Sequence, residues 1–161
     1  MTRLYVIRGN SGSGKTTVAH ALRAALPAPA MVIEQDHFRR IVLKEKEGLE
    51  NTDAVELIRT VAEFGLARDY VVIVEGILGS PKYGPMLVEL MARAGSARAF
   101  YLDVSFEETL RRHATKPNAD AWGEAEMREW WREHDVLGVP GETILGETLS
   151  LSEMVELLAQ E

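Results

Sequence analysis

Short apolar runs alternate along this chain with longer segments in which apolar residues recur at the spacing of a helix. The apolar runs cover residues 4–7, 31–33, 71–74, 97–102 and 143–145. The helical segments cover residues 15–26, 36–43, 53–68, 85–94, 106–113, 124–131 and 152–160. Because alternating strands and helices form parallel sheets with both faces covered, the pattern predicts an α/β domain on a parallel sheet.

Several residues in this pattern are typical of helix starts. Pro85 suits the first turn of a helix, where its missing N–H group is not needed. Ser105 can cap the helix predicted at 106–113, and either Ser150 or Ser152 can cap the last helix. We therefore expect helices to begin close to these residues.

The loop after the first apolar run carries a phosphate-binding motif. Residues 9–16 read Gly-Asn-Ser-Gly-Ser-Gly-Lys-Thr and fit the P-loop pattern GxxxxGK[ST] between a predicted strand and a predicted helix. Glycines let backbone N–H groups curl around phosphate oxygens, and the helix start adds its positive end. A ligand-free Gly/Ser turn is the alternative, but the Lys-Thr pair and both flanks favour a nucleotide site. The predicted nucleotide-binding residues are Gly9, Asn10, Ser11, Gly12, Ser13, Gly14, Lys15, Thr16 and Thr17.

This motif predicts ATP or GTP and Mg²⁺ as ligands. Lys15 is expected to reach the β and γ phosphates, and the Thr16 hydroxyl to hold the metal ion. Glu75 ends the apolar run 71–74 and would lie beside the P-loop, since ligands of open α/β sheets bind beyond the carboxyl ends of strands. Glu75 can bind Mg²⁺ directly or through water, although a glutamate at a strand end can also be an ordinary loop residue.

Asp36 follows the second apolar run and falls at the same edge of the predicted sheet. A carboxylate there can orient and deprotonate a hydroxyl group that accepts a phosphoryl group. Its alternative role is to cap the helix predicted at 36–43. Arg39, one turn later, can bind an anionic part of the acceptor or the γ phosphate, whereas Arg40 is predicted to point away, at the surface.

Residues 114–141 differ from the rest of the chain because they are rich in charge and tryptophan and are broken by proline and glycine. A long insertion of this kind in a compact domain is usually functional or mobile, so we expect a lid. A small helical subdomain that only packs against the edge of the sheet is the alternative.

Cations at the start of this segment are candidates for catalysis. Arg112 and Lys116 share a face if the helix 106–113 continues that far, and a lid could bring them to the transferred phosphate. Basic residues at a helix end can instead simply complement the helix dipole. Arg128 and Arg132 have the same spacing and are further candidates.

Aromatic and imidazole side chains of the segment have a simpler interpretation. Trp130 and Trp131 are neighbours and cannot share a helix face, so packing within the segment is the expectation for these two and for Trp122. His113 and His134 stand among charged neighbours and are predicted to be polar surface residues.

Composition limits the remaining classes of function. The 161 residues suit a single domain, residues 1–161, and 46% hydrophobic with 27% charged residues is typical of a globular protein. Without cysteine, disulfides and thiolate catalysis are excluded, and the four histidines lack metal-ligand spacing. No apolar run is long enough to span a membrane and no signal peptide precedes the first strand, so we expect a cytoplasmic protein. A net charge of −7 disfavours nonspecific nucleic-acid binding, although a local basic patch stays possible.

With these residues in view, the chain resembles small P-loop kinases over nearly its whole length. Residues 74–78, Val-Glu-Gly-Ile-Leu, look like the strand end of uridine kinases and phosphoribulokinases. Residues 35–39 and 103–116 look like polynucleotide kinase and its zeta-toxin and chloramphenicol phosphotransferase relatives. The resemblance implies an adenylate-kinase-type sheet of five parallel strands, order 2-3-1-4-5, flanked by helices and closed by a helical lid. It also implies that Asp36 matches the acceptor-activating base and that Arg39 matches an arginine on the acceptor side.

The sequence therefore predicts an ATP-dependent kinase that transfers the γ phosphate to a hydroxyl of a small polar molecule. The predicted catalytic residues are Asp36, Lys15, Arg39, Arg112 and Lys116. One alternative is a kinase for the 5′-hydroxyl of a nucleoside or polynucleotide. A second is a nucleotide-binding switch or toxin-type module that uses its ATP state to bind a protein partner.

Overall fold

The computed structural model describes residues 3–27, 29–46, 52–117 and 119–160. The strands are β1 (Arg3–Gly9), β2 (Ala30–Glu34), β3 (Val71–Gly76), β4 (Ser96–Asp103) and β5 (Thr143–Gly146). The α-helices are α1 (Lys15–Ala25), α2 (Ala54–Leu66), α3 (Ser80–Arg93), α4 (Phe106–His113), α5 (Glu124–Glu129) and α6 (Leu151–Ala159). A π-helix, η1 (His37–Val42), follows β2, and a 3₁₀ turn, η2 (Ala119–Ala121), precedes α5.

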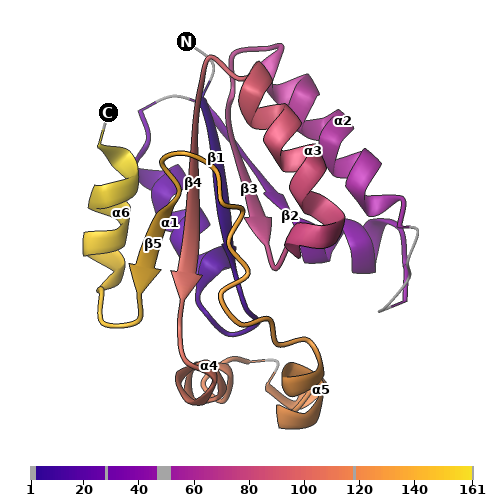
Figure 1. Cartoon of the computed structure of the whole chain (residues 1–161), viewed down its shortest axis with the longest axis vertical. Helices are drawn as coiled ribbons and strands as arrows, with labels where there is room; N and C mark the ends of the chain where they lie inside the picture. The colour runs from indigo at the N-terminus through magenta and orange to yellow at the C-terminus, as the bar shows by residue number, and fades with distance from the viewer. Residues whose placement is uncertain (1–2, 28, 47–51, 118, 161) are drawn as a thin grey trace.

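The five strands form one parallel sheet in the order β2-β3-β1-β4-β5. Figure 1 shows α2 and α3 on one face of the sheet, α1 and α6 on the other, and α4 and α5 beyond the arrowheads of the strands. This is the predicted P-loop fold, and each of the five predicted strands is confirmed. All the carboxyl ends of the strands consequently meet at one edge, where the P-loop also lies.

Strand β3 shows why the sequence favours this sheet. Val72 and Val74 belong to the apolar cluster that includes side chains of α2 and α3, and Val71 and Ile73 belong to the cluster that includes those of α1 and α6. Alternate residues of a strand point to opposite faces, so a strand buried on both faces must be apolar throughout. A run of β-branched residues meets that requirement.

Helix α3 begins earlier than predicted. It starts at Ser80, so that Pro85 lies inside the helix and not in its first turn, contrary to the prediction for 85–94. Pro81 occupies the early position at which the missing N–H group is tolerated. Gly84 precedes Pro85 and lacks the Cβ atom that a following proline would crowd, which makes the interior proline acceptable.

Two of the predicted helix caps are confirmed. The Ser105 hydroxyl accepts a hydrogen bond from the Glu108 N–H group at 3.4 Å. Ser150, and not Ser152, caps α6: its hydroxyl accepts from the Glu153 N–H group, and the Glu153 carboxylate accepts from the Ser150 N–H group at 2.8 Å. This reciprocal pair is a capping box, which the Ser-x-x-Glu spacing indicates.

A buried arginine ties the chain after α5 to the centre of the sheet. Arg8 in β1 is fully buried, and its guanidinium donates to Asp135 at 2.8 Å and to the Leu78 carbonyl at 3.0 Å. Asp135 also accepts from the Ser80 N–H group at 2.9 Å and from the Ser80 hydroxyl. Burial lowers the pKa of Arg8, while the carboxylates of Asp135 and Glu142 raise it. The irregular stretch between α5 and β5 is thereby fixed along the carboxyl edge of the sheet.

Residues 114–141, the segment predicted as a lid, contain η2, α5 and this irregular stretch; Asn118 lies outside the described residues. That the segment moves as a lid stays a prediction. Within the described residues, no helix is both long enough and apolar enough to cross a membrane.

Replacing Ser150 by Ala should lower the free energy of unfolding by about 1 kcal/mol, because an N–H group of α6 then loses its cap. Ser152→Ala is the matched control, since the Ser152 hydroxyl makes only a 3.3 Å contact with Glu156 at the surface and should change stability little. Urea unfolding of both variants tests the assignment, and equal effects would contradict it.

Asp135→Ala should destabilise the fold by about 3–5 kcal/mol, because it leaves the Arg8 charge buried without its closest carboxylate. Asp103→Ala is the control: Asp103 contacts the exposed His134 at 3.2 Å, and a surface pair contributes about 1 kcal/mol or less. Thermal and urea unfolding should separate the two variants clearly. Similar losses in both would show that the buried pair is not a main support of the fold.

Candidate active site

The P-loop connects β1 to α1 and is held from outside by α4. Gly12 has φ +80°, and a Cβ atom on it would lie 2.6 Å from the Thr109 carbonyl oxygen of α4. Only glycine fits a left-handed position at that distance from another backbone. Helix α1 begins at Lys15, so its first N–H groups face the same region as the loop. The sequence motif is therefore a formed phosphate-binding loop.

Lys15, Thr16 and Glu75 meet at the base of the P-loop. Lys15 is buried, and its ammonium group donates to the Asn10 carbonyl at 2.8 Å. The Thr16 hydroxyl donates to the Glu75 carboxylate at 2.9 Å, so the two predicted metal ligands lie side by side. Burial lowers the pKa of Lys15 and raises the pKa of Glu75, and the attraction between the two opposite charges opposes both shifts.

The residues near Glu75 fit a magnesium ion that arrives with a nucleotide. Among the described residues, no group of three His, Cys, Asp or Glu side chains is arranged to hold a metal ion alone. Mg²⁺ bound by one or two protein oxygens, phosphate oxygens and water needs no such group. The hydroxyl and carboxylate of Thr16 and Glu75 are the oxygens that this arrangement would use.

A small pocket of about 290 Å³, here the P-loop pocket, lies over the loop. Its lining residues are Gly12, Gly14, Lys15, Thr16, Thr17, Lys116 and Pro117. Lys116 comes from the segment predicted as a lid and lines this pocket together with Lys15, while its contact with a phosphate stays a prediction. Two lysines therefore face the space where the motif would place phosphates.

Arg112 reaches the P-loop from its outer side. Its guanidinium donates to the Ser13 carbonyl at 2.8 Å, to Glu108 at 2.7 Å and to the Glu147 carbonyl at 3.1 Å. Helix α4 ends at His113, so Arg112 and Lys116 do not share a helix face as the spacing alone suggested. A direct contact between Arg112 and a phosphate stays a prediction.

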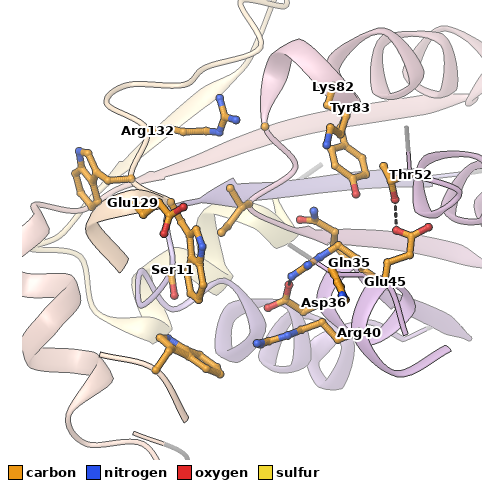
Figure 2. Close-up of a pocket in the computed structure, with 17 residues that line it drawn as sticks. Ser11, Gln35, Asp36, Arg40, Glu45, Thr52, Lys82, Tyr83, Glu129 and Arg132 are labelled. Atoms are coloured by element: carbon orange, nitrogen blue, oxygen red, sulfur yellow. Dashed lines mark hydrogen bonds and ion pairs between the residues drawn. The ribbon is translucent and has the colours of Figure 1, made fainter. Parts of the chain in front are cut away.

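A larger cavity, here the large pocket, has a volume of about 520 Å³ and lies beside the P-loop at the carboxyl edge of the sheet. Figure 2 shows the side chains around it, which come from the P-loop, the chain after β2, the start of α3 and the chain around α5. The lining residues are Ser11, Gln35, Asp36, Arg39, Arg40, Glu45, Lys46, Thr52, Ile77, Gly79, Lys82, Tyr83, Trp122, Glu129, Trp130, Trp131 and Arg132.

Asp36 faces this large pocket. Its side chain is 62% exposed, contacts the Arg39 guanidinium at 3.3 Å and makes no capping hydrogen bond, so the alternative role as a cap is not observed. Gln35, the residue before Asp36, is fixed in position because its side-chain oxygen accepts a hydrogen bond from the Leu78 N–H group at 2.8 Å. A Cβ atom on Gly76 would lie 2.5 Å from that oxygen, so glycine after Glu75 keeps the ends of β2 and β3 together.

Arg40 was predicted to point away, and this is wrong. It lines the large pocket, with its guanidinium 4.9 Å from the centre of the Trp122 ring. Residues four apart on a helix are neighbours, and η1 is wound as a π-helix, so Arg40 returns to the side of Asp36. The spacing could have indicated this.

The aromatic residues of the segment pack together, as expected, and also face the large pocket. The Trp122 ring stacks on His113 at 5.2 Å and meets Trp130 at 6.1 Å, and Trp131 meets Phe106 at 5.2 Å. His113 was predicted to lie at the surface but is 95% buried, with Nε2 2.8 Å from the Trp122 carbonyl oxygen. The charged neighbours in the sequence hid this, because His113 is on the inner face of α4.

A contact between Asn10 and Arg132 was missed by the sequence analysis. The Asn10 side chain donates to the Arg132 carbonyl at 2.7 Å and accepts from the Arg132 N–H group at 2.9 Å. The residues are 122 positions apart, and no local pattern connects them. The amide of Asn10 thus joins the P-loop to the chain after α5.

Comparison with known proteins agrees with this architecture. The APS kinase of Mycobacterium tuberculosis, solved with AMPPNP and APS, has a TM-score of 0.76 at 18% identity, over 98% of this chain and 95% of its own. A shikimate kinase from Acinetobacter baumannii gives 0.63 at 20% identity, over 99% and 92%. A gluconokinase from Sinorhizobium meliloti 1021 gives 0.61 at 21% identity, over 94% and 86%. The expected likeness to small P-loop kinases is thus confirmed at the level of the fold.

Sequence comparison gives the family. No curated protein matches the chain. The family model described as an AAA domain matches residues 4–140, from the first strand to the last turn before β5. Because that match spans most of the chain, this protein belongs to the AAA domain family of P-loop proteins.

Proposed function

We propose that this protein is an ATP-dependent kinase that transfers the γ phosphate to a hydroxyl group of a small polar molecule. The observation that carries the proposal is the carboxylate of Asp36 in a pocket that also includes Ser11 of the P-loop. A phosphoryl acceptor in that pocket would lie between a base and the bound nucleotide. The similar structures support the proposal, since three of them are named as kinases of small molecules.

Each predicted site residue has a role in this reaction. Lys15 and Lys116 bind the phosphate oxygens, and Thr16 and Glu75 hold Mg²⁺, which when bound neutralises the charge on the β and γ phosphates. Asp36 orients the acceptor hydroxyl and accepts its proton as the oxygen bonds to the γ phosphorus. The bond from that phosphorus to the bridging oxygen breaks, and ADP leaves.

Arg39 and Arg112 act beside these groups. Arg39 contacts the Asp36 carboxylate at 3.3 Å and so orients it for the acceptor hydroxyl. Arg112 binds the carbonyl side of the P-loop and keeps its N–H groups directed at the phosphates. Both residues therefore prepare the site for charge that develops during transfer.

Asp36→Asn should lower turnover by about 10² to 10⁴-fold, the usual range for loss of a general base, with nucleotide binding unchanged. Asp69→Asn is the matched control, because Asp69 is exposed at the opposite edge of the sheet from the P-loop. The measurement is transfer of labelled γ phosphate to sugars, nucleosides and 5′-hydroxyl oligonucleotides. Unchanged turnover in Asp36→Asn would remove this residue from the mechanism.

Lys15→Ala should weaken nucleotide binding or phosphoryl transfer without unfolding the chain, because a charge that faces the phosphates is lost. Titration with AMPPNP, together with a thermal unfolding curve, separates the two effects. Wild-type transfer in this variant would contradict the whole mechanism. Slow hydrolysis of ATP that does not depend on Asp36, with no labelled acceptor, would favour the nucleotide-dependent switch instead.

A further inference from the structure

The large pocket has the opposite charge balance to the protein as a whole. The chain carries 25 acidic and 18 basic residues. Around the large pocket, by contrast, cations outnumber carboxylates. The cations are Arg39, Arg40, Lys46, Lys82 and Arg132, and the carboxylates are Asp36, Glu45 and Glu129. A local excess of positive charge in an acidic protein attracts anions to that cavity.

Two of the three carboxylates already have partners within the protein. Asp36 contacts Arg39 at 3.3 Å, and Glu45 accepts from the Thr52 hydroxyl and from the Asp53 N–H group at 2.9 Å. Glu129 is the third carboxylate that lines the pocket. Asp36 and Glu45 are therefore engaged by groups other than Arg132.

Arg132 is held in place through its main chain and not through its charge. The Asn10 side chain binds both the N–H and the carbonyl group of Arg132, and the Tyr101 hydroxyl also donates to that carbonyl at 3.4 Å. Among the described residues, no carboxylate pairs with its guanidinium. These contacts fix the position of residue 132 relative to the P-loop and leave the guanidinium group free to bind a ligand.

Gly79 makes room for this guanidinium. A Cβ atom at residue 79 would lie 2.9 Å from Nε and 3.0 Å from Cζ of Arg132. The backbone of Gly79 has φ −46°, which other residues adopt, so a side chain at residue 79 would act by displacing the Arg132 guanidinium. Figure 2 shows Arg132 and Lys82 on one side of the hollow and Asp36 and Arg40 on the other.

We infer that the acceptor is a hydroxyl compound that carries a separate anionic group, a carboxylate, phosphate or sulfate, and that Arg132 binds this group. The inference rests on the proposed kinase function and adds the class of acceptor. Arg132 lines the large pocket and not the P-loop pocket, in which Lys116 faces the phosphates, so its ligand is the acceptor and not the nucleotide. A guanidinium group suits such an oxyanion because it donates two parallel hydrogen bonds.

Binding without turnover tests this first. The protein, saturated with AMPPNP and Mg²⁺ so that the P-loop is occupied, is titrated calorimetrically with matched pairs of neutral and anionic hydroxyl compounds. The pairs are sorbitol and gluconate, ribose and ribose 5-phosphate, and adenosine and adenosine 5′-monophosphate. We expect an anionic member to bind at least about tenfold more tightly than its neutral partner, since hydrogen bonds to charged groups are the stronger ones.

Two variants assign the effect to Arg132. Arg132→Gln should weaken binding of the anionic probe by about tenfold to a hundredfold, and Gly79→Ala should weaken it in the same way by displacing the guanidinium while its charge remains. The affinity for AMPPNP should not change in either variant. Arg128→Gln is the matched control, because Arg128 pairs with Glu124 at 2.8 Å and lies outside the large pocket.

The outcomes separate this inference from the kinase proposal. Equal affinity for both members of every pair, no binding of any probe, or an Arg132→Gln variant that loses AMPPNP and not the probe would each overturn it. If an anionic probe binds through Arg132 but no labelled phosphate is transferred to it, the anion site stands and the kinase proposal fails. If phosphate is transferred only to neutral members, and this transfer depends on Asp36, the kinase proposal stands and the inferred anion site fails.

Discussion

The ion pair between Arg8 and Asp135 is the interaction on which the rest of the site depends. A guanidinium buried in the central strand has to be neutralised, and the carboxylate comes from a stretch of chain 127 residues away. That requirement draws the chain after α5 across the carboxyl ends of β1 and β4. Once it lies there, Asn10 and Tyr101 can bind residue 132, and residues around α5 can line the large pocket. One buried charge therefore organises a surface that local sequence does not specify.

The two pockets share the P-loop, and the backbone sets their separation. Ser11 lines the large pocket and the next residue, Gly12, lines the P-loop pocket, so adjacent peptides face the two cavities. At the end of β2, the side-chain oxygen of Gln35 accepts a hydrogen bond from the Leu78 N–H group in the turn after β3. This bond holds the ends of the two strands together. The chain on which Asp36 stands is thus held to the turn after β3 by a hydrogen bond to the main chain.

Sequence patterns were sufficient wherever function follows from position in a strand or a motif. The five strands and the meeting of Thr16 with Glu75 could be predicted, because a P-loop between a strand and a helix leaves few arrangements for the neighbouring strand end. The start of α3, the burial of His113 and the contact of Asn10 with Arg132 could not. Each depends on packing between distant parts of the chain, which hydrophobic periodicity does not encode.

The bond from Arg112 to the Ser13 carbonyl has an electronic consequence for the P-loop. The carbonyl of Ser13 and the N–H group of Gly14 belong to the same peptide unit, and Gly14 lines the P-loop pocket. A cation on the oxygen of a peptide polarises the whole unit and makes its N–H group a stronger donor, because hydrogen bonds in series reinforce one another. The loop can thus gain anion affinity from a charge that binds the carbonyl on its outer side.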